Sequence, residues 1–345
     1  MAQLSRREFL KSMGLAGFGA AGAPFIAQEP PPQEETPIQY PVTHWDGSSL
    51  GRILLDVMTV YKEPNWRSGS VGVSYYYDDV VPIEGAVGGL GLYSTNHTWL
   101  KTAEGYIYTS WVQPMNHIEN PVVPIGEGGA WGQVTIPKTW MRSAPSDDSW
   151  RNRPLYYSTV NRVVAAENDY YQVQEIYGTK YWVKAAHMRI IPPEELAPIS
   201  PEVPAEAKWA YVSLRDQRLR CYEHENLVAE FMVSTGMPST PTPVGDFRVH
   251  DKRIGQRMTG GLGAGAYNLP GIPFVSYFTR RWAATHGCYW HNDYGRLHSN
   301  GCVNMLPENA KWFFRWSTPV VDYWAFSTKA NSEIGQPGTP ITVGP

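Results

Sequence analysis

Six side chains that can act as nucleophiles, acids, bases or metal ligands lie between residues 286 and 302. They are His286, Cys288, His291, Asp293, His298 and Cys302. A cysteine thiol becomes a nucleophile when a histidine within hydrogen-bond distance takes its proton and nearby backbone N–H groups stabilise the oxyanion. Gly301 allows the tight turn that would expose the Cys302 sulfur, and His286 is distant enough in sequence to lie on an adjoining strand. The sequence therefore predicts that Cys302 is a nucleophile with His286 as its base.

A zinc site is the alternative chemistry for the same segment. The candidate ligands would be His286, Cys288, His291, His298 and Cys302. These side chains are of types that zinc binds. Their spacing, however, fits neither the paired Cys-x-x-Cys pattern nor the His-Glu-x-x-His pattern of common zinc sites. We therefore expect no metal and no other cofactor.

The residues around the predicted pair resemble a family signature. His286-Gly287 is followed by Ser299-Asn300-Gly301-Cys302-Val303-Asn304, which is similar to the motif of the L,D-transpeptidases, whose YkuD-type catalytic domain acts on peptidoglycan stem peptides. Asn300 stands where many members have histidine, and this chain has a histidine at His298 instead. Upstream segments resemble the family's opening strands, its Thr-Pro-x-Gly-x-Phe segment and the stretch that lines its substrate groove. They are residues 217–236, 240–247 and 267–274, so that the resemblance covers about residues 207–327 in the family's order.

This resemblance implies a role for each residue of the motif. Cys302 is expected to attack the L-to-D peptide bond of a tetrapeptide stem, releasing the terminal D-alanine and leaving a thioester. His286 is expected to act as base in this step and again when an amine from a neighbouring stem resolves the thioester. The amides around Gly301 and Cys302 are expected to hold the oxyanion, while Ser299 and Asn300 shape the turn. The residues implied to bind substrate are Tyr267, Gly287, His298 and Asn304.

The implied function is that of a cysteine-dependent L,D-transpeptidase that forms cross-links or attaches amine acceptors in the cell wall. An L,D-carboxypeptidase, in which water replaces the amine, is one alternative. A wall-binding protein with a degenerate catalytic domain is the other, although Cys302 and His286 are both present. The net charge of −3 does not indicate a nucleic-acid partner. The expected partners are therefore peptidoglycan stem peptides.

The sequence around each cysteine also predicts whether its thiol is ionised or buried. A protonated histidine beside a thiol lowers the thiol pKa to about 3.5–7.5, so Cys302 and His286 are expected to be thiolate and imidazolium at neutral pH. Cys221 lies in an alternating strand and is expected in the core. Cys288 is expected to be a partly buried free thiol.

The composition indicates a mainly β chain with many turns, because it includes 32 Gly, 29 Pro, 14 Trp and 21 Tyr. Pro- and Glu-rich linkers are predicted at residues 28–44 and 192–206. Loosely repeated strands between them resemble bacterial SH3-type barrels, and one irregular β domain is the alternative. The predicted fold is thus two small SH3-like barrels followed by a β-rich L,D-transpeptidase catalytic domain. Their bounds are 45–115 and 130–191 for the barrels, 207–327 for the catalytic domain and 328–345 for a C-terminal tail.

Within the predicted catalytic domain, period-2 stretches predict strands over residues 209–214, 217–222 and 227–236. A helix is predicted over residues 307–317, because apolar residues recur at helical spacing and Pro307 is well placed to begin it.

The first residues have the order of an export signal. Arg6-Arg7 is followed by a short apolar stretch rich in Gly and Ala and then by the first linker. The paired arginines resemble a twin-arginine signal, which implies residues 1–27 as the signal and the twin-arginine export machinery as a partner. An amphipathic N-terminal helix is the alternative. We therefore expect the protein in the cell wall, in the periplasm or outside the cell.

Overall fold

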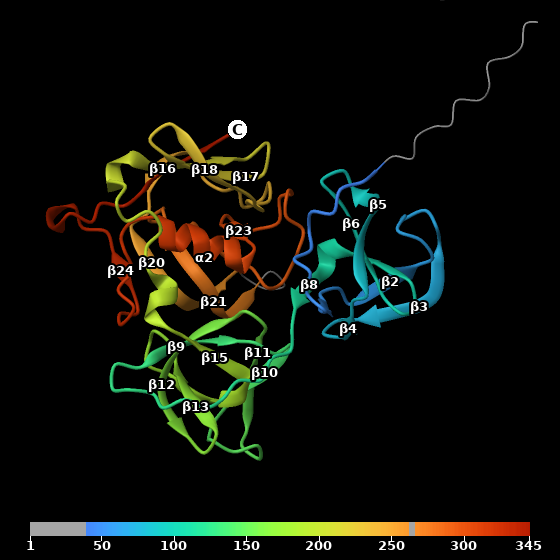
Figure 1. Cartoon of the computed structure of the whole chain (residues 1–345), viewed down its shortest axis with the longest axis horizontal. Coiled ribbons are helices and arrows are strands. Elements are labelled where there is room, and N and C mark those ends of the chain that lie inside the picture. Colours follow the sequence, from blue (N-terminus) through green and yellow to red (C-terminus); the bar gives the residue numbers. More distant parts are fainter. Residues whose placement is uncertain (1–38, 262–265) are drawn as a thin grey trace, which may run out of the picture. The chain divides into compact units, whose positions relative to one another are not determined.

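Short strands are the main regular structure in the part of the chain that the computed structural model describes, residues 39–261 and 266–345. They form one sheet of three strands, one of seven and three of five (Figure 1). The mainly β fold class predicted from the composition is confirmed. The predicted export signal at residues 1–27 and the beginning of the first linker lie outside the described residues.

The first lobe, which we define as residues 39–115, contains two small sheets around a core of its own. The three-stranded sheet has the order β4-β1-β8 and the five-stranded sheet the order β3-β2-β7-β6-β5. Alternate residues of β2 are buried, as expected for strands with one face on a core. The strands are β1 (Leu50–Ile53), β2 (Val57–Tyr61), β3 (Ser70–Tyr76), β4 (Val80–Pro82), β5 (Gly85–Tyr93), β6 (Asn96–Lys101), β7 (Tyr106–Tyr108) and β8 (Val112–Met115). The core residues are Ile53, Met58, Val60, Val81, Leu100, Ile107 and Val112.

The second lobe, residues 116–206, is built on a seven-stranded sheet of order β11-β10-β14-β13-β12-β9-β15. Its core is separate from that of the first lobe and includes Val134, Met141 and Val183. Separate cores are what two small domains require, and the SH3-type class of the two lobes stays a prediction. The strands are β9 (Ala130–Val134), β10 (Lys138–Arg142), β11 (Arg151–Tyr156), β12 (Val160–Glu167), β13 (Tyr170–Gln174), β14 (Lys180–Lys184) and β15 (Met188–Ile191).

The third lobe, residues 207–345, combines two five-stranded sheets with one α-helix. The sheets have the orders β18-β17-β16-β25-β19 and β23-β22-β21-β20-β24. The strands are β16 (Lys208–Ser213), β17 (Arg218–Glu223), β18 (Asn226–Met232), β19 (Gly245–Arg248), β20 (Asp251–Gly260), β21 (Tyr267–Tyr277), β22 (Ala284–Gly287), β23 (Val303–Met305), β24 (Thr328–Lys329) and β25 (Pro340–Gly344). The three strands predicted between residues 209 and 236 are confirmed as β16, β17 and β18, although β18 ends at Met232.

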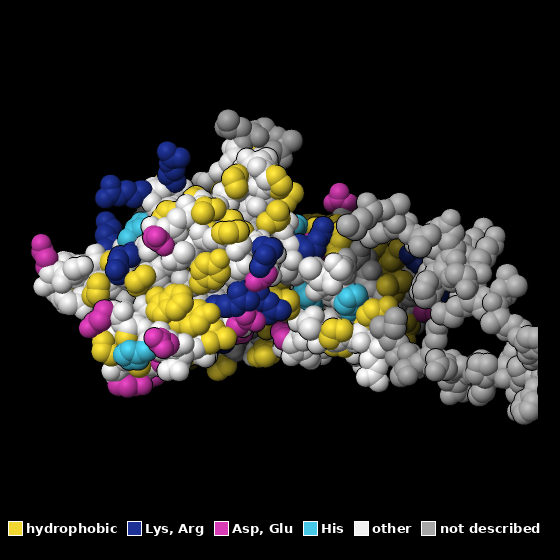
Figure 2. Space-filling model, turned by 90° about the horizontal axis from the view of Figure 1, so that it is seen from above, with side chains coloured by type: hydrophobic (Ala, Val, Ile, Leu, Met, Phe, Trp, Pro, Cys, Tyr) yellow, Lys and Arg dark blue, Asp and Glu magenta, His cyan; other side chains and the backbone are white. Residues whose placement is uncertain are grey.

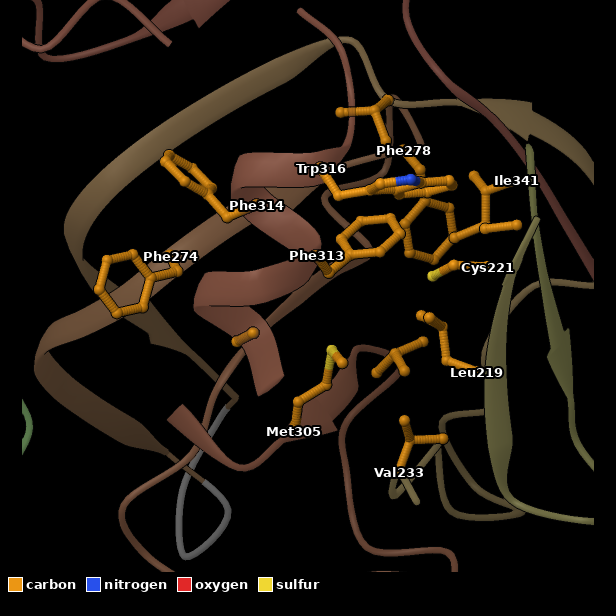
Figure 3. Packing of buried hydrophobic residues seen from close by; sticks show 14 of the residues in the cluster. Leu219, Cys221, Val233, Phe274, Phe278, Met305, Phe313, Phe314, Trp316 and Ile341 are labelled. Carbon is orange, nitrogen blue, oxygen red and sulfur yellow. The ribbon is translucent and has the colours of Figure 1, made fainter. Parts of the chain in front are cut away.

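Helix α2 (Pro307–Trp316) joins the two sheets of the third lobe through its buried face, and it confirms the predicted helix. Phe313 and Trp316 point toward the strand residues Leu219 and Cys221, whereas Phe314 faces Phe274 of β21 (Figure 3). The buried ammonium group of Lys252 donates to carbonyl groups at the end of the helix, namely those of Phe314, Ser317 and Pro319. Cys221 is fully buried, as the sequence predicted. The helix is thereby fixed beside β22, the strand that carries His286.

Two predicted boundaries need correction. The stretch from residue 328 onward is no tail, because β25 lies between β16 and β19 in the middle of a sheet. The first linker does not extend to residue 44 as a free tether, since His44 is only 2% exposed and its Nε2 donates a hydrogen bond to the Tyr294 carbonyl. Both segments find their partners in parts of the chain that are distant in sequence, so local composition gave no sign of them.

Candidate active site

Strands β22 and β23 bring the two predicted reactive residues together. The strands are parallel neighbours, with Thr285 opposite Val303 and His286 opposite Asn304. Cys302 immediately precedes β23 and therefore lies at the end of the strand that adjoins the one carrying His286. Both side chains line one pocket of about 330 Å³. Its lining is Met258, Tyr267, Leu269, Ile272, His286, Trp290, His298, Ser299, Asn300, Cys302 and Asn304.

The turn that carries Cys302 is held by Ser299. Gly301 has φ +111°, a conformation that residues with a side chain rarely adopt, and its amide donates to the Ser299 hydroxyl over 3.1 Å. The same hydroxyl donates to the Cys302 carbonyl. Asn300 is exposed at the tip of the turn. Since the Gly301 amide is already bonded, the Cys302 amide is the better candidate of the two for holding an oxyanion.

The Cys302 thiol lies at the pocket wall and is uncharged at neutral pH. Its S–H group donates to the Trp282 carbonyl over 3.8 Å. Burial raises the pKa of the thiol to about 11, against a smaller lowering by the backbone amide of Ala284. The loss of hydration therefore disfavours the expected thiolate.

His286 is oriented by its own strand. The side chain is 2% exposed, and its Nδ1 lies 3.1 Å from the Gly287 carbonyl oxygen. A carbonyl only accepts hydrogen bonds, so Nδ1 carries the proton and Nε2 is left as a basic lone pair. Burial lowers the pKa of His286 to about 4, which keeps the ring neutral at physiological pH. Burial of both groups thus favours a neutral thiol and a neutral imidazole over the expected thiolate–imidazolium ion pair.

Two more histidines lie at the pocket, one in its wall and one buried behind it. The rings of His291 and His298 are 4.0 Å apart, and His298 lines the pocket while His291 is buried. The Asp293 amide donates to Nδ1 of His291, so Nε2 carries the proton in the neutral ring. That Nε2 is 2.9 Å from the side-chain amide of Asn304, which must then present its oxygen. His291 therefore fixes Asn304, a contact that the sequence gave no reason to expect.

The other two residues predicted to bind substrate, Tyr267 and Gly287, differ in whether they line the pocket. Tyr267 lines the pocket, and burial raises the pKa of its hydroxyl. Gly287 does not line it: a Cβ placed there would be 2.7 Å from the Pro273 side chain and 3.0 Å from Pro307. Gly287 is tightly packed and its carbonyl orients His286, while its role in substrate binding stays a prediction.

The first lobe holds the segment between His286 and Cys302 in place. His44 Nε2 is 2.8 Å from the Tyr294 carbonyl oxygen, and the Asn292 side chain donates to the His44 carbonyl over 2.7 Å. The Asn292 amide also donates to the Ser110 carbonyl. These residues are far apart in sequence, which is why no local pattern indicated them. The third lobe alone therefore does not determine the position of the 288–298 segment.

Trp111 of the first lobe packs against His298, a residue that lines the pocket. Its ring lies 5.2 Å from that of His298, between centroids. His298 in turn lines the pocket together with Cys302. Trp111 is thus a further candidate for a residue that positions the site, and only the tertiary structure reveals it.

The zinc alternative lacks a suitable ligand set in the described part of the chain. Among residues 39–261 and 266–345, no three His, Cys, Asp or Glu side chains converge as a group that could hold a metal ion. Cys288 is fully buried rather than partly so, and its thiol donates to the His291 carbonyl over 3.8 Å. Burial raises the pKa of Cys288 to about 12, which disfavours the thiolate that a metal would bind.

A comparison with known protein families finds a match for the third lobe. The model of the YkuD family, the L,D-transpeptidase catalytic domain, matches residues 207–343. No curated protein is similar enough to the chain to count as a match.

Similar solved structures include a mutant L,D-transpeptidase from Enterococcus faecium, at 23% identity over 40% of this chain and 50% of that one, with a TM-score of 0.32. An L,D-transpeptidase from Mycobacterium smegmatis has 14% identity over 54% and 90% of the two chains and a TM-score of 0.34. L,D-transpeptidase 1 from Mycobacterium tuberculosis has 21% identity over 40% and 61%, with a TM-score of 0.30. The chain spans about half the length of the Enterococcus protein. Residues 207–343, which match the model of this family, hold both Cys302 and His286.

Proposed function

We propose that the protein is a cysteine-dependent L,D-transpeptidase that acts on peptidoglycan tetrapeptide stems. The observation that carries the proposal is that His286 of β22 and Cys302, the residue before the adjacent parallel strand β23, line one pocket inside the matched domain. The reaction needs no nucleotide, because a thioester conserves the free energy of the donor peptide bond.

In the first half-reaction, the Cys302 sulfur attacks the carbonyl carbon of the L-to-D peptide bond while Nε2 of His286 takes the thiol proton. The S–H group first turns away from the Trp282 carbonyl, to which it donates in the resting enzyme. The Cys302 amide stabilises the negative oxygen of the tetrahedral intermediate. His286 then returns the proton to the leaving amine, the C–N bond breaks, and a thioester remains.

In the second half-reaction, the amine of a neighbouring stem attacks the thioester carbonyl. His286 takes a proton from the attacking nitrogen and gives it to the departing sulfur, so that the new amide bond forms and the thiol is restored. Water in place of the amine would make the same site an L,D-carboxypeptidase.

A mass-spectrometric assay tests this function. Purified protein is incubated with a muropeptide that contains tetrapeptide stems, and both the products and the protein are weighed. We expect a mass increase on Cys302, loss of the terminal D-alanine and formation of a dimer. Cys302→Ala should give none of these, whereas Cys288→Ala, a change at the other thiol near the pocket, should form the same adduct. A trimmed product without any dimer would support the carboxypeptidase, and no adduct and no product would support a wall-binding protein.

We also propose that residues 1–27 are a twin-arginine export signal and that the enzyme works in the wall, in the periplasm or outside the cell. The order of Arg6-Arg7, the apolar stretch and the linker supports this. Among the residues that the structure describes, no helix is long and apolar enough to cross a membrane. Replacing both arginines by lysine should leave the protein in the cytoplasm at its full precursor length. Continued export of this double variant would contradict the proposal, and a variant with Lys11→Arg serves as the control for a conservative change nearby.

A further inference from the structure

One wall of the Cys302 pocket is formed by strands β20 and β21. In the register of these two strands Met258 lies opposite Leu269, and Gly260 lies opposite Tyr267. The wall residues are Met258, Tyr267, Leu269 and Ile272. The shape of this wall therefore depends on what holds the two strands in place.

The part of β20 and β21 that forms the wall has no neighbouring strand among the described residues. β24 pairs with β20 only at Asp251 and Lys252, and β22 pairs with β21 only at Ser276 and Tyr277. Residues 256–260 and 267–272 thus form a two-stranded ribbon whose outer edges are both unpaired. An isolated pair of strands is only marginally stable in water. The ribbon therefore needs support from another part of the molecule.

Four polar side chains connect the ribbon to the second lobe. Glu175, in the loop between β13 and β14, has its Oε2 3.2 Å from Nη1 of Arg257 in β20 and its Oε1 3.5 Å from Nη1 of Arg153 in β11. Both arginines also donate to the side-chain oxygen of Asn268 in β21, Arg257 over 2.8 Å and Arg153 over 3.3 Å. We call these four residues the Glu175 cluster.

The Glu175 cluster contacts the face of the ribbon that points away from the pocket. Successive side chains of a strand point to opposite faces, so Asn268 lies on the face opposite to its neighbours Tyr267 and Leu269. Neither Arg257 nor Asn268 lines the pocket. The cluster therefore holds the ribbon from behind, next to the residues that form the wall.

A second contact with the second lobe lies nearer the base of the ribbon. A Cβ placed on Gly255 would be 2.2 Å from the Val160 carbonyl oxygen, and one placed on Gly271, which has φ +62°, would be 2.8 Å from the Thr159 side chain. Glycine at these two points lets the start of β12 approach the ribbon closely. The base of the ribbon is thus held by backbone packing, and its far end is held by the Glu175 cluster.

Glu175 supplies the only negative charge of the cluster. Its side chain is 10% exposed, and those of Arg153 and Arg257 are 18% and 32% exposed. Among the ion pairs of the described residues, neither arginine has another acidic partner. Removal of the Glu175 charge would leave two partly buried guanidinium groups close together and unpaired, which is unfavourable.

We propose that Glu175 is a positioning residue for the reaction, which holds the β20–β21 wall against the second lobe and so maintains the pocket that receives the stem peptide. The inference rests on the proposed transpeptidase function. Cys302 and His286 lie on or beside β22 and β23, outside the ribbon. Loss of the Glu175 charge should therefore weaken the binding of substrate and leave the chemistry of the bound substrate intact.

Steady-state kinetics of D-alanine release test the proposal. Glu175→Gln keeps the size of the side chain and removes its charge. It should raise the KM for the tetrapeptide stem roughly 3- to 10-fold, as expected for a partly buried ion pair, and leave kcat within about twofold. Glu230→Gln is the matched control, because Glu230 also pairs with two arginines, Arg218 and Arg220, but does not line the pocket. This control should leave both constants unchanged.

A double-mutant cycle tests whether the contact between Glu175 and Arg257 is responsible. Arg257→Gln should also raise KM, and the two changes together should raise it by less than the product of their separate effects, because both break the same contact. Equal KM values for Glu175→Gln and Glu230→Gln would overturn the proposal. So would a fall in kcat at unchanged KM, or independent effects of the two changes.

Hydrogen exchange separates this inference from the proposed function, because it needs no substrate. Peptides that cover residues 256–260 and 267–272 should exchange faster in Glu175→Gln than in Glu230→Gln, whereas peptides from β22 and β23 should exchange equally in both. If no protein forms a thioester, the proposed function fails, and the exchange rates still decide whether Glu175 holds the ribbon. Equal exchange of the ribbon peptides in the two variants would overturn the inference even where the thioester forms.

Discussion

At the scale of single residues, the main result is the neutral state of the Cys302 and His286 pair. Burial raises the pKa of the thiol to about 11 and lowers that of the imidazole to about 4. Charge separation in such a site is unfavourable because neither ion would be hydrated. Proton transfer from the sulfur to His286 is therefore expected during the attack on the substrate and not before it.

This state predicts a distinctive pH profile for alkylation of Cys302. Iodoacetamide reacts with the thiolate, so the rate should be low near pH 6 and rise about tenfold per pH unit toward alkaline pH. His286→Gln should not shift the profile, because the imidazole carries no charge that stabilises the thiolate. Peptide mass spectrometry assigns the label to Cys302, since Cys221 and Cys288 are buried. Fast labelling near pH 6 that disappears in His286→Gln would instead demonstrate an ion pair.

Cys221 and Cys302 are predicted to differ in their effects on activity and stability. Cys221 is fully buried in the core of the third lobe, so Cys221→Ala should lower the free energy of unfolding by about 1 kcal/mol without affecting the reaction. Cys302→Ala should abolish the reaction and leave the unfolding free energy nearly unchanged, because Cys302 lies in a partly exposed turn. Urea titration and the muropeptide assay measure the two effects. The assignment of roles fails if Cys302→Ala retains turnover.

At the scale of elements, strands β22 and β23 set the distance between His286 and Cys302, while the segment that joins them is held from outside. The contacts of His44 with the Tyr294 carbonyl and of Trp111 with His298 show that the first lobe packs against this segment. A segment without regular secondary structure needs such partners, because its own backbone makes few ladder hydrogen bonds.

Trp111→Ala tests this positioning role. Removal of the indole frees the ring of His298, and the rate of Cys302 acylation should fall by roughly tenfold, as expected for displaced site residues. Trp66→Ala, at an exposed tryptophan of the same lobe, should leave the rate unchanged. Both rates are measured well below the melting temperature of each variant. Identical acylation rates for the two variants would show that the first lobe does not position the pocket.

At the scale of the whole molecule, a buried charged group joins the three lobes. Arg52 is 1% exposed and bonds to Asp78 over 2.8 Å within the first lobe and to the Tyr289 carbonyl of the third lobe. Its guanidinium also lies 4.0 Å from the centre of the Tyr156 ring in the second lobe, whose Lys138 pairs with Asp78. Elsewhere, acidic and basic side chains are mixed over most of the visible face, with several Lys and Arg side chains gathered toward the left edge (Figure 2). The net charge of the protein therefore says little about its partners. Local groups of charged side chains determine which ligands a surface attracts.

The buried histidines predict that the fold is less stable in weak acid. Burial lowers the folded pKa of five histidines below the ordinary value of 6.5; they are His44, His187, His286, His291 and His298. Their contribution to stability is complete above pH 6.5 and is lost as the pH falls through the lowered values. For His286, with a folded pKa of about 4, the loss amounts to about 3 kcal/mol by pH 4.

Urea unfolding at about pH 7.5 and about pH 5 checks this, because the unfolding free energy should be lower at the acidic value. The paired carboxylate of Glu195 does not interfere in this range. Arg189, hydrogen-bonded to Glu195, lowers the pKa of that carboxyl to about 2, so its protonation matters only at lower pH. Equal free energies at the two pH values would contradict the prediction.

The sequence by itself determined the mainly β class, helix α2 and strands β16 to β18, and it predicted Cys302 and His286 as the reactive pair. Those features depend on local periodicity and on a motif of fixed spacing, which the chain carries without reference to distant residues. The tertiary structure decided the features that depend on long-range packing. Strand β25 lies between β16 and β19, His44 contacts Tyr294 and Trp111 contacts His298. Gly287 packs tightly against Pro273 and Pro307 and does not line the pocket. The tertiary structure also decided the charge state of the pair. Ionisation depends on burial and on neighbours in space, and neither can be read from residue types and spacing alone.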